Sequence, residues 1–387
     1  MRHYLLIIII VCLLLSGCGF SGSIYSNYRA IEDLQLIQTL GIDRTGTRST
    51  LSAAASATEE SGTPTILRRS GGSILEAMDS LQDYTTRGEL FFAHVQYILL
   101  GQDYAEQGVG KLLDFVERDV HMRLGTGLFV LCGGTAEELI TGPGEADYDI
   151  AEVLASVKRD LELRGDSHVY TFRETAVDLS ECGAALVCAL KTVETEGSIF
   201  PEEDSLTAVP VGYGVLRSDR LAGFLEGRAA EAVSLLTGNL GTVPRRVPDG
   251  SGGEITLEYG GSAELKPQWN ADGSPSPMEV EAKLTAVIGE LDSDRERLMD
   301  DAYLDFLEDK LSRQIEEDIR GVLAQSQTMD ADFLGLGRKL RLSDGKNFAA
   351  LPGTWLQDME FDVCAEAKIV RSYDLDNPVQ TEGGKQQ

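Results

Sequence analysis

The sequence predicts a multidomain α+β protein, in which a mixed α/β region precedes a C-terminal antiparallel sheet with one long helix packed on it. The first half alternates apolar strand-like runs with helical patterns, which is typical of a sheet covered by helices. The second half combines strands of alternating hydropathy with one long helical stripe. The 387 residues allow two or three domains, at roughly 100–200 residues per domain.

The N-terminus has the pattern of an export signal. Arg2 precedes an unbroken apolar run from Tyr4 to Leu14, and Leu15-Ser16-Gly17-Cys18 follows. The run is too short to span a bilayer but matches the apolar core of a signal peptide. Leu-Ser-Gly-Cys resembles the lipobox of bacterial lipoproteins, which implies cleavage between Gly17 and Cys18 and a diacylglyceryl group on the Cys18 thiol. The alternative is an ordinary signal peptide with a chance cysteine.

The first half of the remaining chain predicts strands and helices in alternation. Its helices repeat apolar residues every three or four positions, and its strands are short apolar runs. Residues 34–43 predict either a helical turn or a strand. The other strands are expected at 51–57, 91–100, 128–132, 169–172 and 184–193, and the helices at 73–87, 110–119, 136–140 and 150–163.

The second half predicts a different arrangement. Alternating apolar residues, as at Ile255, Leu257 and Tyr259, indicate strands with one buried face. A stripe from Leu304 to Val322 with three- and four-residue steps indicates a long amphipathic helix. We expect strands at 209–216, 221–225, 255–259, 280–288 and 361–369, a short helix at 228–236 closed by Gly238, and the long helix from about 294 to 325.

These patterns divide the chain into five parts. The acidic run Pro201-Glu202-Glu203-Asp204 indicates a boundary near residue 205. We expect a signal peptide at 1–17, a lipid-anchored tether at 18–30, an N-terminal α/β region at 31–205 that can hold two subdomains, a C-terminal α+β domain at 206–375, and a polar tail at 376–387.

The charge balance excludes two classes of partner. The chain carries 34 basic and 63 acidic side chains, a net charge of −29. Nucleic-acid binding and attraction to anionic lipid both need a basic surface, so we expect neither. After the signal, no second apolar stretch is long enough to cross a bilayer. We therefore expect an ectodomain held by the lipid on Cys18 at the outer face of the cytoplasmic membrane, or in a periplasm.

The histidines do not predict a metal site. His94, His121 and His168 are far apart, and no His-Glu-x-x-His motif places two ligands on one helical face. We expect His94 to be a hydrogen-bonded core residue of the strand at 91–100, and His121 to pair with Asp119. No nucleophile elbow, phosphate-binding loop or dinucleotide fingerprint is present in the sequence.

Two charged groups imitate functional sites. Asp330, Asp332 and Gly335 occupy calcium-loop positions, but Arg341 stands where that loop needs a bidentate glutamate, so calcium binding is rejected. The group Arg118, Asp119 and Arg123 is interpreted as a helix-capping ion-pair network rather than as catalytic residues. We predict no catalytic residues, no cofactor and no metal.

Four cysteines remain beyond the lipobox. Cys182 and Cys188 are separated by five residues, which matches no common zinc or redox spacing. Disulfides are permitted outside the cytoplasm, and four cysteines allow three pairings. We favour buried free thiols and leave the disulfides open for Cys132, Cys182, Cys188 and Cys364.

Several segments together resemble the Ger(x)C lipoproteins, the C subunits of spore germinant receptors. The match runs in family order over most of the chain beyond the signal, although each motif alone is weak. The segments, after the lipobox, are Tyr28 to Leu34, Leu40-Gly41-Ile42-Asp43, Phe92-Ala93-His94 through Leu100-Gly101, Ala105 to Gly108, Leu113 to Asp119 with Met122-Arg123, Gly214 to Gly227, and Asp330 to Gly337 with Trp355.

The resemblance implies three α/β-type domains on a lipid anchor at the spore inner membrane. It also implies assembly with an A-type and a transporter-like B-type membrane subunit, and a non-enzymatic part in the response of spores to small nutrient germinants. The alternative is a substrate-binding lipoprotein of an uptake system, a class that usually has two similar lobes. The dissimilar halves of this chain argue against that alternative.

Overall fold

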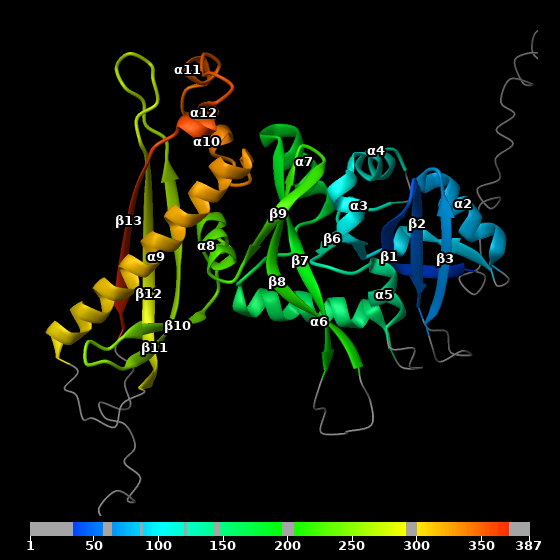
Figure 1. The fold of residues 1–387 in the computed structure, drawn as a ribbon, viewed down its shortest axis with the longest axis horizontal. Helices are drawn as coiled ribbons and strands as arrows, with labels where there is room; N and C mark the ends of the chain where they lie inside the picture. The colour runs from blue at the N-terminus through cyan, green and yellow to red at the C-terminus, as the bar shows by residue number, and fades with distance from the viewer. Residues whose placement is uncertain are drawn as a thin grey trace, which may run out of the picture.

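The fold contains two β-sheets that stand side by side, with helices on their faces (Figure 1). The computed structural model describes residues 34–56, 64–85, 88–119, 122–142, 148–195, 205–291 and 300–370. Within these ranges, the N-terminal sheet has nine strands and the C-terminal sheet has four. The predicted multidomain α+β fold is therefore confirmed.

The N-terminal sheet is mixed. Its strand order is β3-β2-β1-β5-β6-β7-β8-β9, and β4 pairs with β1. Strands β1, β5, β6 and β7 are parallel to one another. The pairs at the two ends of the sheet, β3-β2-β1 and β7-β8-β9, are antiparallel. Its strands are β1 (Leu34–Thr45), β2 (Arg48–Ala55), β3 (Thr65–Gly71), β4 (Glu89–Phe91), β5 (Tyr97–Leu100), β6 (Gly127–Leu131), β7 (Ala184–Thr195), β8 (Ser205–Arg217) and β9 (Arg220–Glu226).

The central strands are apolar throughout because helices cover both faces of the sheet. In β5, Ile98 and Leu100 face one core, and Tyr97 and Leu99 face the other. The first core is closed by α2 (Ile74–Tyr84), α3 (Gln102–Gln107), α4 (Gly110–Arg118) and the start of α7 (Phe172–Cys182). The second is closed by α5 (Ala136–Thr141) and α6 (Ile150–Arg164).

Two predicted strands in this half were wrong, and some elements were missed. The strand expected at 91–100 is interrupted, because β4 ends at Phe91 and the 3₁₀ helix η2 (Phe92–His94) separates it from β5. The strand expected at 169–172 is a single bridge between Thr171 and Gly127, after which α7 begins. The edge strand β3 and the short helix α3 were not expected at all.

The boundary expected near residue 205 falls inside the N-terminal sheet. Strand β8 begins at Ser205 and pairs with β7 along its whole length, and β9 pairs with β8. The next helix, α8 (Arg228–Thr237), packs on β8 and β9 with one side and on the C-terminal elements with the other. The change of sheet therefore comes after β9, and α8 lies between the two sheets (Figure 1).

The C-terminal sheet has the order β10-β11-β12-β13. Its strands are β10 (Val243–Pro248), β11 (Glu254–Lys266), β12 (Met278–Leu291) and β13 (Phe361–Ile369). The first three are antiparallel, as predicted, but β13 is parallel to β12. The reason is α9 (Asp301–Met329), which carries the chain back along the sheet, since parallel neighbours need such a crossover.

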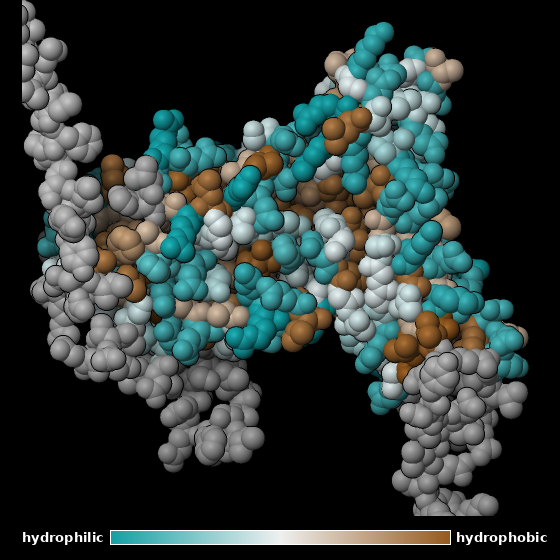
Figure 2. Space-filling view, turned by 180° about the vertical axis from the view of Figure 1, so that it is seen from behind, coloured by the Kyte–Doolittle hydropathy of each residue, from teal (hydrophilic) through white to brown (hydrophobic). Residues whose placement is uncertain are grey.

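Helix α9 covers one face of this sheet, and hydrophilic residues dominate the other face (Figure 2). Leu307, Leu311, Ile315 and Ile319 of α9 are buried against the inward residues of the strands, such as Val280. After α9, the short helices α10 (Leu336–Ser343), α11 (Gly345–Phe348) and α12 (Trp355–Asp358) lead into β13.

Side chains of α9 also form hydrogen bonds along the outer edge of β13. The backbone N–H groups of Ile369, Ala367 and Ala365 donate to Glu308, Ser312 and Glu316 at 2.8, 3.0 and 3.1 Å. Arg320 donates to the carbonyl of Val363 at 2.8 Å. The four helix residues are four positions apart, so one face of α9 follows the strand edge. An edge covered in this way cannot pair with another strand.

Candidate functional site

The predicted lipidation site lies outside the described residues. Gly17 and Cys18, together with the expected signal peptide and tether, belong to residues 1–33, so lipid attachment at Cys18 stays a prediction. No helix within the described ranges is long and apolar enough to span a membrane. The motifs that the resemblance singled out are therefore the first candidates.

The first motif, Gly41-Ile42-Asp43, fixes helix α5 on the sheet. Asp43 is buried, and its two carboxylate oxygens accept the N–H groups of Ala136 and Glu137 at 2.8 and 2.9 Å. These amides belong to the first turn of α5 and have no partner within the helix. Burial raises the pKa of Asp43, although the two amide hydrogen bonds oppose this effect. The carboxylate thus satisfies a helix end across 93 residues of sequence.

The glycines of two motifs make room for this contact. A Cβ atom on Gly101 would collide with the Oδ1 atom of Asp43. A Cβ atom on Gly41 would lie 2.5 Å from Cδ1 of Ile140 and 2.9 Å from Cβ of Ala136. Gly101 also donates its N–H to the carbonyl of Ile42 at 2.9 Å. The segments Leu40 to Asp43 and Leu100-Gly101 are therefore two halves of one contact.

The Ala105 to Gly108 motif contacts the β8–β9 hairpin. Gly108 has a φ of 125°, and a Cβ atom there would lie 2.8 Å from Oδ2 of Asp219. The neighbouring Val109 donates its N–H to the carbonyl of Asp219 at 2.6 Å. A side chain at position 108 would be strained by the backbone angle and blocked by the hairpin. This motif therefore connects the parallel part of the sheet to its last hairpin.

The Asp330 to Gly337 motif forms a buried turn before α10. The Asp332 carboxylate accepts the N–H groups of Leu336 and Gly337 at 2.6 and 2.8 Å. Its burial raises the pKa of Asp332 to about 6. A Cβ atom on Gly337 would lie 3.0 Å from the ring of Trp355. The residues that imitate a calcium loop thus serve to start a helix.

Charged residues next to this turn join the C-terminal elements to the N-terminal sheet. Arg338 of α10 donates to Asp178 of α7 and forms an ion pair with Glu181 at 3.1 Å. Arg217, at the end of β8, bonds to the side chain and backbone of Asp330. We call these five residues the charge clasp. The two sheets are thus joined in two places, by the contacts around α8 and by the charge clasp.

Among the described residues, the remaining charged side chains and histidines do not gather into a reactive centre. Arg118 pairs with Asp114 at 2.7 Å on the exposed face of α4, a partner that was not expected, and Asp119 is the C-cap residue of that helix. His94 is exposed in η2 beside Phe91, so the expected core role was wrong. His168 packs edge-on against Tyr170, and burial lowers its pKa. His121 lies outside the described residues.

The four cysteines are unpaired in the structure. Cys188 is buried, and burial raises its pKa to about 12, which makes it an inert thiol. Cys132 and Cys182 are partly buried, and burial raises their pKa values as well. Cys364 is exposed, contrary to the expectation of buried thiols. No cluster of metal-ligating side chains occurs in the part of the chain that the structure describes.

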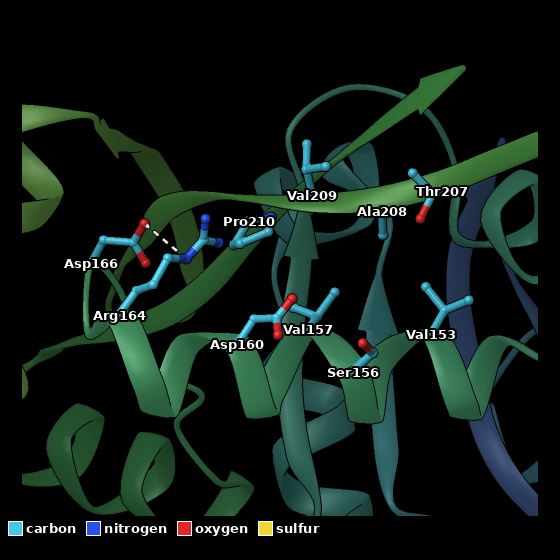
Figure 3. Close-up of a pocket in the computed structure, with 10 residues that line it drawn as sticks. All are labelled: Val153, Ser156, Val157, Asp160, Arg164, Asp166, Thr207, Ala208, Val209 and Pro210. Atoms are coloured by element: carbon cyan, nitrogen blue, oxygen red, sulfur yellow. Dashed lines mark ion pairs between the residues drawn. The ribbon is translucent and has the colours of Figure 1, made fainter. Parts of the chain in front are cut away.

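A groove of about 580 Å³ lies between α6 and β8 (Figure 3). Val153, Val157 and Ala208 give it an apolar floor, and Asp160, Arg164 and Asp166 supply charge. Figure 3 shows Arg164 and Asp166 together at one end, where their closest charged atoms are 3.9 Å apart. Sequence reasoning missed this groove, because its two walls are about 50 residues apart in the chain and carry no motif.

Two protein-family models match the chain in succession. Residues 27–188 match the spore germination protein N-terminal domain, and residues 211–373 match the family described as spore germination B3/GerAC like, C-terminal. Together with the two-sheet fold, these matches define a multidomain α+β protein of the spore germination class. The chain belongs to the GerAC-like family of spore germination proteins, as the sequence resemblance indicated.

Two relatives agree with this family. The chain is 23% identical over 379 residues to "Putative spore germination protein YfkR" of Bacillus subtilis (strain 168), a match that covers 92% of both chains. Its fold is similar to that in "Crystal Structure of the GerBC protein", with a TM-score of 0.56 and 19% identity over 88% of this chain and 100% of that one. At that identity the structural match speaks for the fold alone.

Proposed function

We propose that this protein is the lipid-anchored C subunit of a spore germinant receptor. In this role it assembles with A-type and B-type membrane subunits at the outer face of the spore inner membrane and is required for the response to small nutrient germinants. The observation that supports the proposal most directly is the pair of family models, which match 27–188 and 211–373 in order. The proposal gives the subunit a non-enzymatic role.

The geometry of the motifs supports a subunit that acts by presenting binding surfaces to partner proteins rather than by catalysis. Asp43, Gly108 and Asp332 each fix one element onto another, and none of them lines the groove between α6 and β8. A substrate-binding lipoprotein is less well supported, because the nine-stranded and four-stranded sheets differ in strand order and are not two similar lobes.

The test is a germination assay on spores of a strain that lacks the gene, complemented with variants. The wild-type gene should restore the response to the receptor's germinant, and Cys18→Ala should not, because the protein loses its anchor. Cys364→Ala removes an exposed cysteine outside the lipobox and is the matched control, which should restore the response fully. A null strain that germinates normally with every nutrient tested contradicts the proposal.

A further inference from the structure

The groove between α6 and β8 follows the edge of a strand. Thr207, Ala208, Val209 and Pro210 all line it. Side chains of a strand alternate between its two faces, so four consecutive residues can line one groove only if the groove runs along the strand edge. Figure 3 shows α6 running beside this stretch of β8.

This part of the edge has no strand beside it. Strand β9 pairs with β8 only from Gly212 to Arg217. The β7–β8 pairing continues to Ser205, so the first seven residues of β8 have β7 on one side and, among the described residues, no strand on the other. Its outward-facing peptide groups there are available to a further strand, except that Pro210 has no N–H to donate.

A β-bulge separates the paired and unpaired halves of β8. The β7–β8 register shifts after Ala189, so that Val211 is the extra residue. Gly212 follows with a φ of 135°, and a Cβ atom there would collide with the carbonyl oxygen of Leu225. Bulges bend a strand and interrupt pairing. The bulge at Val211 therefore marks the point where β8 stops pairing with β9 and the groove begins.

The groove is chemically selective. Its floor is apolar, and its charged side chains are two carboxylates against one guanidinium. The Oδ1 atom of Asp166 is buried and accepts no hydrogen bond, while its Oδ2 atom is 3.9 Å from Arg164. The Asp166 side chain is 37% exposed and the Asp160 side chain is exposed, so the accessible part of each carboxylate can take a cation or an N–H donor from a partner.

We propose that this groove binds an extended segment of a partner protein, which adds to β8 as a strand and places a basic side chain at Asp160 and Asp166. Main-chain hydrogen bonds to the free edge would supply affinity, and the apolar floor and the carboxylates would select alternate side chains. Four strand residues span about 13 Å, so a short segment is enough. The proposal goes beyond the proposed function and does not depend on it.

The probe is a synthetic eight-residue peptide in which valine and lysine alternate, added to the full-length chain in detergent micelles. Hydrogen exchange should show new protection of those β8 amides between Thr207 and Val211 that face away from β7, since the others already bond to β7 and Pro210 has no amide hydrogen. Fluorescence anisotropy should show saturable binding. A peptide with glutamate in place of lysine, and one with proline in place of valine, should bind at least about tenfold more weakly, since they lack the cation or the strand.

Variants separate the groove from general charge attraction. Ser156→Trp fills the groove from the exposed side of α6 and should abolish binding. Asp160→Asn with Asp166→Asn should weaken it about tenfold. Glu117→Gln with Glu152→Gln removes the same charge from exposed positions outside the groove and should leave binding within about twofold.

Thermal unfolding checks that each variant is folded. If Asp166→Asn impairs folding, the exposed Asp160→Asn alone carries the charge test.

Three outcomes overturn the proposal. The first is binding without protection of the β8 amides. The second is an equal loss of affinity in the control pair of glutamate variants, which would mean unspecific charge attraction. The third is a self-associated chain that Ser156→Trp converts to a monomer, which would mean that the occupant is a second copy.

Discussion

Gly101→Ala is expected to detach the Asp43 carboxylate from helix α5. The backbone at Gly101 has φ −62° and ψ 146°, which alanine adopts freely, so the new methyl group acts only through its collision with Oδ1 of Asp43. To escape, the carboxylate must leave the N–H groups of Ala136 and Glu137. Hydrogen bonds to a charged group contribute about 1.5–3 kcal/mol each, so the free energy of unfolding should fall by about 3–6 kcal/mol.

A double-mutant cycle tests the cause. Asp43→Ala alone leaves the two amides without their acceptor and should cost about 2–4 kcal/mol. In the double variant the methyl group meets no carboxylate, so its stability should lie within about 1 kcal/mol of Asp43→Ala. The matched control is Gly125→Ala, where a Cβ atom meets nothing within 4 Å. It should change stability by less than about 0.5 kcal/mol.

The assay is urea unfolding followed by far-UV circular dichroism, with hydrogen exchange at the amides of Ala136 and Glu137 as the local probe. Both amides should exchange faster in Gly101→Ala than in the wild type. Additive losses in the double variant would refute the reasoning, because they would mean that Gly101 and Asp43 act on stability independently.

Three further substitutions test other parts of the structure. Gly321→Ala lies inside α9 with open space around it, so the urea midpoint should rise by the equivalent of about 0.5–1 kcal/mol; a lower midpoint contradicts the open site. Arg245 is 4% exposed and joins Glu231 and Asp318 at 2.6 and 2.7 Å, so Arg245→Met should lower stability by about 3–5 kcal/mol in thermal unfolding, because two carboxylates lose their shared cation. An unchanged melting temperature would count against that role. The pKa of the Asp332 carboxyl is raised from 3.8 to about 6, so the folded protein binds the carboxyl proton more tightly than the unfolded chain does. The protonated carboxyl therefore stabilises the fold fully below about pH 4, and this stabilisation is lost as the pH rises through 6. Asp332→Asn cannot titrate, so between about pH 4 and 7 the free energy of unfolding of the wild type should fall by roughly 3 kcal/mol relative to that of the variant. If the free energies of unfolding of both proteins change in parallel over this range, the prediction is wrong.

Elements with a strong local pattern could be predicted from the sequence, and the failures have local causes. Strand β10 was missed because Pro244 and Pro248 argue against a strand, but both prolines lie on an edge, where a missing N–H is tolerated. Helix α7 had a readable signal, the capping box between Thr171 and Glu174, which a short apolar run obscured. The parallel direction of β13 followed from the long crossover helix that had itself been predicted.

The contacts of the motifs could not be predicted, because they join distant parts of the chain. The motifs Gly41-Ile42-Asp43 and Leu100-Gly101 could be recognised in the sequence. Nothing in the local sequence indicates, however, that Asp43 caps a helix 93 residues later. The groove depends likewise on a bulge at Val211 and on where β9 ends, which are properties of strand pairing. Sequence patterns state which face of an element is apolar, and they leave open which elements meet.

The four hydrogen bonds between α9 and β13, each of which is one rung of a ladder, join two elements with different repeat lengths. Four helix residues rise about 6.0 Å, whereas two residues of a parallel strand rise about 6.6 Å. From Glu308 to Arg320 and from Ile369 to Val363 the two lengths therefore diverge by about 2 Å. The first three rungs use short reaches, and the last uses the long side chain of arginine, which absorbs the difference. The helix thus follows the edge of β13 over four contacts, from Ile369 to Val363.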